Sequence, residues 1–144
     1  TIAVGKSDFQ YSLPNTGEGY EAAATQVVAP SGIDQIDSRG KYMYEIYCSP
    51  CHGTSGNNDG GVFKKVSTLK PAWKGYSDDY IKNLPEGQIY HVLTYGKNNM
   101  GSHASVLKPV DRWRVVKYVK LLSQGSKSSN VASNATTMDT AVVK

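Results

Sequence analysis

The chain has 144 residues and a formal net charge of +4, which suits one domain with extended ends. No apolar run approaches the ~18 residues that cross a bilayer, so the sequence excludes a transmembrane helix of its own. Charge is uneven: residues 1–36 hold one lysine and four acidic residues, whereas residues 37–123 hold thirteen Lys/Arg and seven acidic residues. The basic part is either a solvated lysine surface or a docking face for an acidic protein, and we expect no nucleic-acid partner.

Residues 1–36 are rich in Gly, Pro, Ser, Thr and Asn and show no stable hydrophobic period. This composition predicts an extended N-terminal arm, in which residues 19–28 make a turn or two of helix. Its aromatic residues Phe9, Tyr11 and Tyr20 favour an arm that is bound to a surface. Because the chain begins at Thr1, we expect a processed N-terminus, with a removed signal peptide or a lipid-bearing residue upstream.

The segment 37–123 is expected to form the folded domain, and its hydrophobic pattern predicts helices over 37–48, 78–84, 85–96 and 108–123. The last of these is the clearest, because its apolar residues form a wide face that includes Trp113, Val116, Val119 and Leu122. Residues 53–77 are predicted to form a loop, and residues 124–144 a polar tail. No segment has the pattern of a strand, so the fold class is all-α, with three to five helices.

Both cysteines of the chain lie in the stretch "YCSPCHG", as Cys48 and Cys51 with His52 directly behind them. A dithiol redox pair uses this spacing, but normally at the start of a helix that follows a strand. A structural zinc site has four ligands, usually from two pairs of Cys or His residues. Beyond Cys48, Cys51 and His52 the sequence offers only His91 and His103. The motif CxxCH favours the third chemistry, in which two thioethers hold one haem c and His52 ligates its iron.

A six-coordinate haem needs a second axial ligand from the opposite side. Methionine thioether is a soft, neutral ligand that favours ferrous iron. Met43 lies on the helix that leads into Cys48, and Met138 lies in the polar tail. Met100 lies in a loop between two predicted helices, so we expect it to be the ligand, with His103 as the rival. His91 falls in the middle of a helix beside apolar residues and is expected to be a packed or pocket-edge histidine.

From about Gly40 to Leu122 the sequence resembles class I cytochromes c. The resemblance lies in the Gly40–Tyr44 pair, the motif "CSPCHG", the loop methionine and a C-terminal helix with Trp113 and Tyr118. It implies that the first and last helices cross, with Gly40 allowing close approach and Tyr118 or Trp113 filling the contact. It also implies a proline carbonyl that orients His52, for which Pro71 is the candidate by position. Other tentative haem-pocket residues are Tyr44 and Tyr95.

A narrower resemblance comes from "LPEGQIYHVLTYGKNNMGSHASVLKPVDRWRVVKYVKLL". This stretch is similar to the monohaem cytochrome c subunits of bacterial alternative complex III, and to cytochrome c domains fused to haem-copper oxidases. Those sequences usually have proline after the ligand methionine, whereas here Gly101 follows Met100, and glycine gives that loop more freedom.

These resemblances imply one-electron transfer, with no substrate and no enzymatic step in this chain alone. Three hypotheses remain: a subunit of a membrane respiratory complex that links quinol oxidation to a terminal oxidase, a freely diffusing periplasmic cytochrome c, and a haem peroxidase or gas sensor with an open sixth position. The expected location is the periplasmic side of a bacterial inner membrane. The lysines expected at a docking edge for the redox partner are Lys64, Lys65, Lys74 and Lys97.

Overall fold

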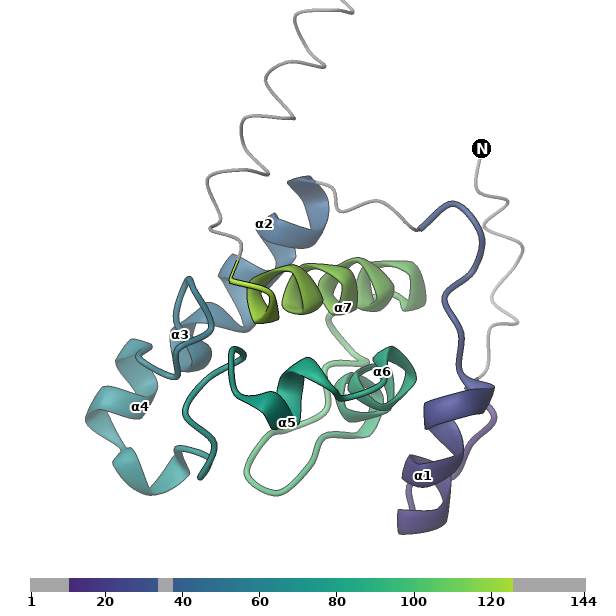
Figure 1. Cartoon of the computed structure of the whole chain (residues 1–144), viewed down its shortest axis with the longest axis horizontal. Coiled ribbons are helices and arrows are strands. Elements are labelled where there is room, and N and C mark those ends of the chain that lie inside the picture. Colours follow the sequence, from purple (N-terminus) through teal and green to yellow (C-terminus); the bar gives the residue numbers. More distant parts are fainter. Residues whose placement is uncertain (1–10, 34–37, 126–144) are drawn as a thin grey trace, which may run out of the picture.

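A computed structural model describes residues 11–33 and 38–125, and this part of the chain is helical (Figure 1). Its α-helices are α1 (Gly17–Gln26), α2 (Ser38–Tyr47), α3 (Ser49–His52), α4 (Gly61–Lys65), α5 (Asp79–Lys82), α6 (Glu86–Tyr95) and α7 (Pro109–Ser123), with a 3-10 helix η1 at Ser67–Leu69. The all-α prediction is confirmed. The helices exceed the predicted three to five because α3, α4 and α5 are single turns of four or five residues.

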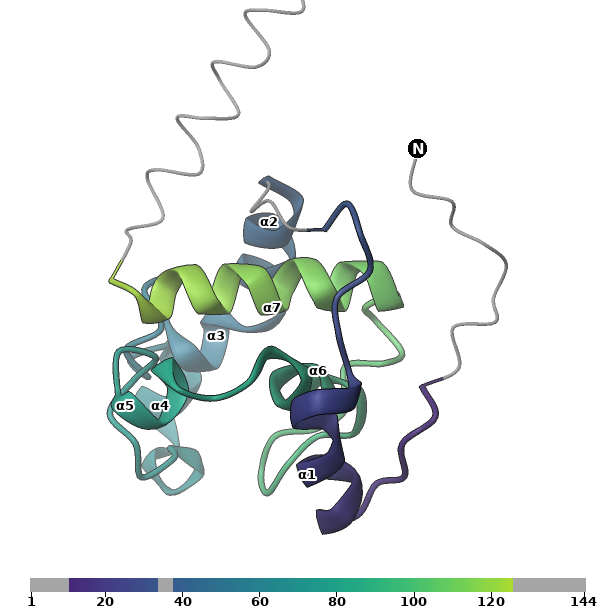
Figure 2. The same cartoon turned by 45° about the vertical axis from the view of Figure 1, so that its right-hand side comes forward.

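The helices α2 and α7 cross and form the centre of the fold (Figure 2). Gly40 lies at the crossing, where an added Cβ would come within 2.7 Å of the Arg114 carbonyl oxygen. One turn further along each helix, the rings of Tyr44 and Tyr118 pack with centroids 5.1 Å apart. A side chain at position 40 would push the two helices apart, so the close approach implied by the class I resemblance requires glycine there.

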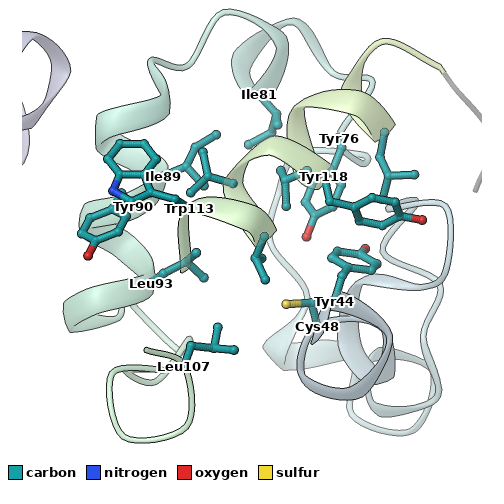
Figure 3. Packing of buried hydrophobic residues seen from close by; sticks show 14 of the residues in the cluster. Tyr44, Cys48, Tyr76, Ile81, Ile89, Tyr90, Leu93, Leu107, Trp113 and Tyr118 are labelled. Atoms are coloured by element: carbon teal, nitrogen blue, oxygen red, sulfur yellow. The ribbon is translucent and has the colours of Figure 1, made fainter. Parts of the chain in front are cut away.

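A second buried layer joins α6 to α7, and Trp113 belongs to it. Trp113 stacks on Tyr90 of α6 with centroids 4.5 Å apart, on the opposite side of α7 from Tyr44 and Tyr118 (Figure 3). Of the two aromatic residues expected at the α2–α7 crossing, Tyr118 therefore lies there and Trp113 does not. The apolar face predicted for α7 is confirmed, since Val115, Val116, Val119 and Leu122 are buried with Trp113.

The N-terminal arm contains a helix of ten residues, which is longer than the turn or two that the sequence suggested. Thr16 caps it by accepting a hydrogen bond from the Gly19 N–H at 3.0 Å, and the alanine run that follows favours helix. The helix α1 packs against α6, on the side away from α3 and α4 (Figures 1 and 2). Tyr11 and Tyr20 both contact this surface, whereas Phe9 lies outside the described residues.

The segment 53–77, predicted to be a loop, contains α4 and η1. The reason is tertiary: Phe63 of α4 is buried against the ring of His52, with centroids 5.4 Å apart. Packing of one aromatic residue stabilises a short helical turn that has little propensity of its own. Within the described residues, no helix is both long and apolar enough to cross a membrane.

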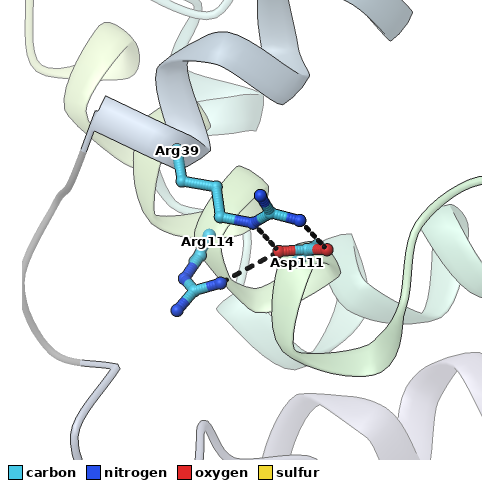
Figure 4. A network of polar contacts seen from close by, with 3 residues as sticks. All are labelled: Arg39, Asp111 and Arg114. Carbon is cyan, nitrogen blue, oxygen red and sulfur yellow. Dashed lines mark hydrogen bonds and ion pairs between the residues drawn. The ribbon is translucent and has the colours of Figure 1, made fainter.

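An ion-pair network ties the start of α7 to α2 (Figure 4). Asp111 accepts hydrogen bonds from Arg39 Nε at 2.7 Å and Nη2 at 3.1 Å, and from Arg114 Nη1 at 3.0 Å. The Asp111 side chain is only 6% exposed. The Arg39 guanidinium, followed by Arg114, lowers the pKa of this carboxyl below its usual value, although burial opposes the shift.

Replacing Asp111 with asparagine is expected to lower the free energy of unfolding at neutral pH by about 2 kcal/mol, because charge-assisted hydrogen bonds are lost. Since the folded-state pKa is depressed, this stabilisation is complete above the unfolded-state pKa of about 4 and is lost as pH falls through the folded value. Denaturant titrations between pH 7 and pH 3 should therefore show the difference between wild type and Asp111→Asn shrinking in acid. Asp79→Asn, at an exposed carboxyl of α5, is the control and should show a small, flat difference.

Candidate functional site

The two cysteines and His52 lie on one turn of backbone between α2 and the following loop. Cys48 caps α3, and its carbonyl oxygen accepts from the N–H of Cys51 at 3.2 Å and of His52 at 2.9 Å. The Tyr44 hydroxyl donates to the Gly53 carbonyl at 2.7 Å and fixes the end of this turn. Both thiols are free; Cys48 is buried, with its sulfur toward the core, and Cys51 is partly exposed (Figure 3).

One nitrogen of His52 is held by the following loop. The Nδ1 atom donates to Asn58 Oδ1 at 2.9 Å, and Asn58 Nδ2 donates to the Trp73 carbonyl at 2.9 Å. Asn58 is 1% exposed and has a left-handed backbone (φ 56°), which turns its side chain back toward His52. With the proton on Nδ1, the lone pair of the imidazole lies on Nε2, which is the atom that ligates a metal.

The residue that orients His52 differs from the one expected. The class I resemblance suggested the Pro71 carbonyl, whereas in the structure the partner of His52 Nδ1 is the Asn58 side chain. Pro71 is partly buried, and the nearby carbonyl that joins this network belongs to Trp73. A sequence pattern gives no sign of Asn58, because the "GNNDGG" run indicates a turn but not which of its side chains points inward.

Aromatic rings surround the His52 imidazole. Trp73 stacks at 5.8 Å with an interplanar angle of 11°, Tyr76 lies at 5.3 Å, and Phe63 meets it edge-on. Burial lowers the pKa of His52, Asn58 opposes the shift, and the charge of His103 adds to the lowering. The aromatic surroundings of His52 therefore favour its neutral form, which is the form in which an imidazole binds iron.

Met100 lies in the loop that joins α6 to α7. Its backbone pairs with Lys97 in both directions, with N–O distances of 2.9 Å, and its partly buried side chain packs against the hydrophobic core that contains Cys48. His103, three residues on, donates from Nδ1 to the Gly101 carbonyl at 3.0 Å. The structure thus brings both candidate axial residues into one loop, with His103 close enough to influence the pKa of His52.

The remaining candidate residues are Tyr95, His91 and four lysines. Tyr95 donates from its hydroxyl to the Leu13 carbonyl at 2.6 Å, so it faces the N-terminal arm. His91 is 3% exposed, and its Nδ1 hydrogen-bonds to the Tyr11 hydroxyl at 2.7 Å, which confirms the packed histidine. The four lysines expected at a docking edge, Lys64, Lys65, Lys74 and Lys97, are all exposed.

Two of the three chemistries open to Cys48 and Cys51 fit poorly. A dithiol redox pair needs a thiolate of lowered pKa, yet burial, with a smaller contribution from Cys51, raises the pKa of Cys48 to about 12. For zinc, residues 11–33 and 38–125 contain no group of three or more His, Cys, Asp or Glu side chains placed to hold a metal ion. A haem fits the donors that are present: two reduced thiols, an imidazole and a thioether that packs against the core cluster containing Cys48.

Comparison with known proteins gives one family. The family model described as "Cytochrome C oxidase, cbb3-type, subunit III" matches residues 35–119, which is more than half of the chain. The match runs from just before α2 into α7 and includes Cys48, Cys51, His52 and Met100. No curated protein matches the chain.

Proposed function

Because the chain belongs to the family of the cbb3-type cytochrome c oxidase subunit III, we propose that it carries single electrons through one covalently bound haem as a subunit of a membrane respiratory complex. The family assignment confirms a class I cytochrome c domain and haem-mediated electron transfer. The observation that supports a covalent haem is the turn of Cys48, Cys51 and His52, with His52 Nδ1 already occupied by Asn58. The bound haem would supply an iron that alternates between ferrous and ferric states.

Each residue of the turn has a separate task in this proposal. Cys48 and Cys51 would hold the haem through two thioethers, each formed by adding the S–H bond across a vinyl group, sulfur to one carbon and hydrogen to the other, so attachment would need reduced thiols and no oxidant. His52 would offer Nε2 to the iron, and Met100 would offer its thioether sulfur from the loop between α6 and α7. The aromatic residues around His52 would limit the access of water to it, which would reduce reorganisation when the charge of the site changes.

We expect alanine at both Cys48 and Cys51 to abolish covalent attachment. Mass spectrometry of the unfolded chain should find one haem on the wild type, one on each single variant through the remaining thioether, and none on the double variant. Ser49→Ala, between the two cysteines and partly exposed, is the control and should keep its haem. A wild-type chain without added mass, or a double variant that keeps haem after unfolding, would contradict the proposal.

Two observations bear on whether the chain works in a complex or alone. The family is described as an oxidase subunit, and the stretch 84–122 resembles the cytochrome subunits of alternative complex III, which couple quinol oxidation to a terminal oxidase. The alternative is a freely diffusing periplasmic cytochrome c. It is supported by the packing of the described part of the arm on α6 of the same chain, because an arm packed in this way needs no neighbouring subunit to bind it. Either protein would face the periplasm, where c-type haem is attached.

The native particle distinguishes these two proposals. If the protein is a complex subunit, gentle solubilisation of membranes should yield it with companion chains in fixed ratio, and a periplasmic wash should contain little of it. A haem-bearing monomer released in the wash would instead support the diffusing carrier. A haem peroxidase or sensor would show high-spin iron that binds peroxide or a gas directly, without displacement of a protein ligand.

A further inference from the structure

The N-terminal arm makes two polar contacts with the last five residues of α6, which lead into the Met100 loop. The Tyr11 hydroxyl hydrogen-bonds to His91 Nδ1 at 2.7 Å, and the Tyr95 hydroxyl donates to the Leu13 carbonyl at 2.6 Å. Tyr95 is the last residue of α6 and stands five positions before Met100. The arm thus holds the end of the helix from which the ligand loop departs.

A third contact reaches the loop itself. Lys97 Nζ lies 4.1 Å from the centroid of the Tyr20 ring, in a cation–π contact. The backbone of Lys97 pairs with that of Met100 in both directions. Lys97 therefore links Tyr20 of α1 to Met100: its side chain contacts the Tyr20 ring, and its backbone is hydrogen-bonded to that of Met100.

The arm packs closely against α6, with backbone in contact with backbone. Gly87 of α6 abuts the backbone of Ala23 and Val27, where a Cβ on Gly87 would collide with their carbonyl oxygens. Gln88 Nε2 also donates to the Tyr20 carbonyl at 3.2 Å. These contacts fix the arm against one face of α6. They therefore also fix the position of Leu13 relative to Tyr95 and of Tyr20 relative to Lys97.

We propose that residues 11–33 act as a strap, and that Tyr11 and Tyr20 of this strap, together with Tyr95 of α6, are positioning residues that hold the Met100 loop where Met100 would ligate the iron. One position of the loop is loosely packed, because Gly101 has no atom other than those of its chain neighbours within 4 Å of the place its Cβ would occupy. Nothing in the loop packs against that position, and glycine increases its conformational freedom. This inference rests on the proposed function, since it assumes that Met100 ligates the iron.

Imidazole binding to the ferric holoprotein tests the strap, because added imidazole takes the sixth position only when Met100 leaves. Tyr95→Phe keeps the ring and removes one hydrogen bond, and Tyr20→Leu removes the cation–π contact. Each variant is expected to bind imidazole about fivefold more tightly than the wild type, the factor that corresponds to one lost interaction of this kind. The absorption band of methionine-ligated ferric iron should also disappear at lower temperature.

Three controls separate the strap from general stability and from the ligand assignment. Tyr20→Phe keeps the ring contact with Lys97 and removes only the hydroxyl, which hydrogen-bonds to Tyr80, so it should keep the wild-type imidazole affinity. Asp111→Asn should lower the free energy of unfolding without changing imidazole affinity. Strap variants with wild-type imidazole affinity overturn the strap while leaving the proposed function intact. If Met100→Ala fails to strengthen imidazole binding, the ligand assignment fails, and the strap with it.

Discussion

Replacing Met100 with alanine is expected to remove the sixth ligand and to lower the reduction potential by on the order of 0.1 V or more, within the ~0.8 V range that axial ligands span. The thioether is a neutral, soft donor that stabilises ferrous iron, and water or an added base in its place favours the ferric state. The ferric variant should lose the long-wavelength band of methionine ligation and bind imidazole directly. Potentiometric titration with absorption spectroscopy measures both effects.

Met43→Leu is the matched control, because Met43 is half-buried on α2 and the exchange conserves volume. It should keep the wild-type potential and spectrum. The rival ligand gives a distinct pattern: if His103 binds the iron, His103→Ala would change the spectrum of the resting protein and Met100→Ala would not. A low-spin spectrum in Met100→Ala that disappears in the Met100→Ala/His103→Ala double variant would show that His103 replaces the methionine only when it is absent.

The features that the sequence predicted well are those determined by short spacing. Helix α7 carries its apolar residues at three- and four-residue steps, so its buried face follows from periodicity. Gly40 and Tyr44 lie one turn apart on α2, and the close crossing with α7 that the class I resemblance implied for this pair is present, with Gly40 against the Arg114 carbonyl oxygen. The turn from Cys48 to His52 is equally local, since its hydrogen bonds span three or four residues.

The features that the sequence could not predict depend on contacts between distant segments. The helix α1 has weak signals of its own, and its packing on α6 joins residues more than sixty positions apart. The short helix α4 forms where Phe63 packs on His52. Trp113 has the right period for the α2–α7 crossing, but the position of α6 decides that it stacks on Tyr90 instead.

Asn58 is the clearest case, because nothing about an asparagine in a glycine-rich turn distinguishes it from Asn57 beside it. Asn58 is 1% exposed and bridges His52 and the Trp73 carbonyl, whereas Asn57 is exposed. The left-handed backbone at position 58 makes the difference, and that conformation is a property of the folded loop. A residue found only from the structure gives the sharpest test of how His52 is controlled.

Two substitutions at Asn58 are expected to move the reduction potential in opposite directions. Asn58→Asp places a carboxylate on His52 Nδ1–H, which makes the imidazole a stronger donor, favours ferric iron and lowers the potential. Asn58→Leu removes the acceptor, weakens the donor strength of the imidazole and raises the potential. Leucine should also reduce the free energy of unfolding by about 3 kcal/mol, because it leaves the Trp73 carbonyl and His52 Nδ1 without partners and disfavours the left-handed backbone.

Potentiometric titration measures the reduction potentials of the Asn58→Asp and Asn58→Leu holoproteins, with Asn57→Asp as the control. Asn57→Asp adds the same charge one residue away, at an exposed position, so only a small shift from screened electrostatics is expected there. If both Asn58 variants shifted the potential in the same direction, or if Asn57→Asp shifted it as much as Asn58→Asp, charge and stability alone would explain the data. Opposite shifts confined to position 58 require a directional hydrogen bond from His52 Nδ1, which places Nε2 on the iron and makes the loop 53–60 part of the redox site.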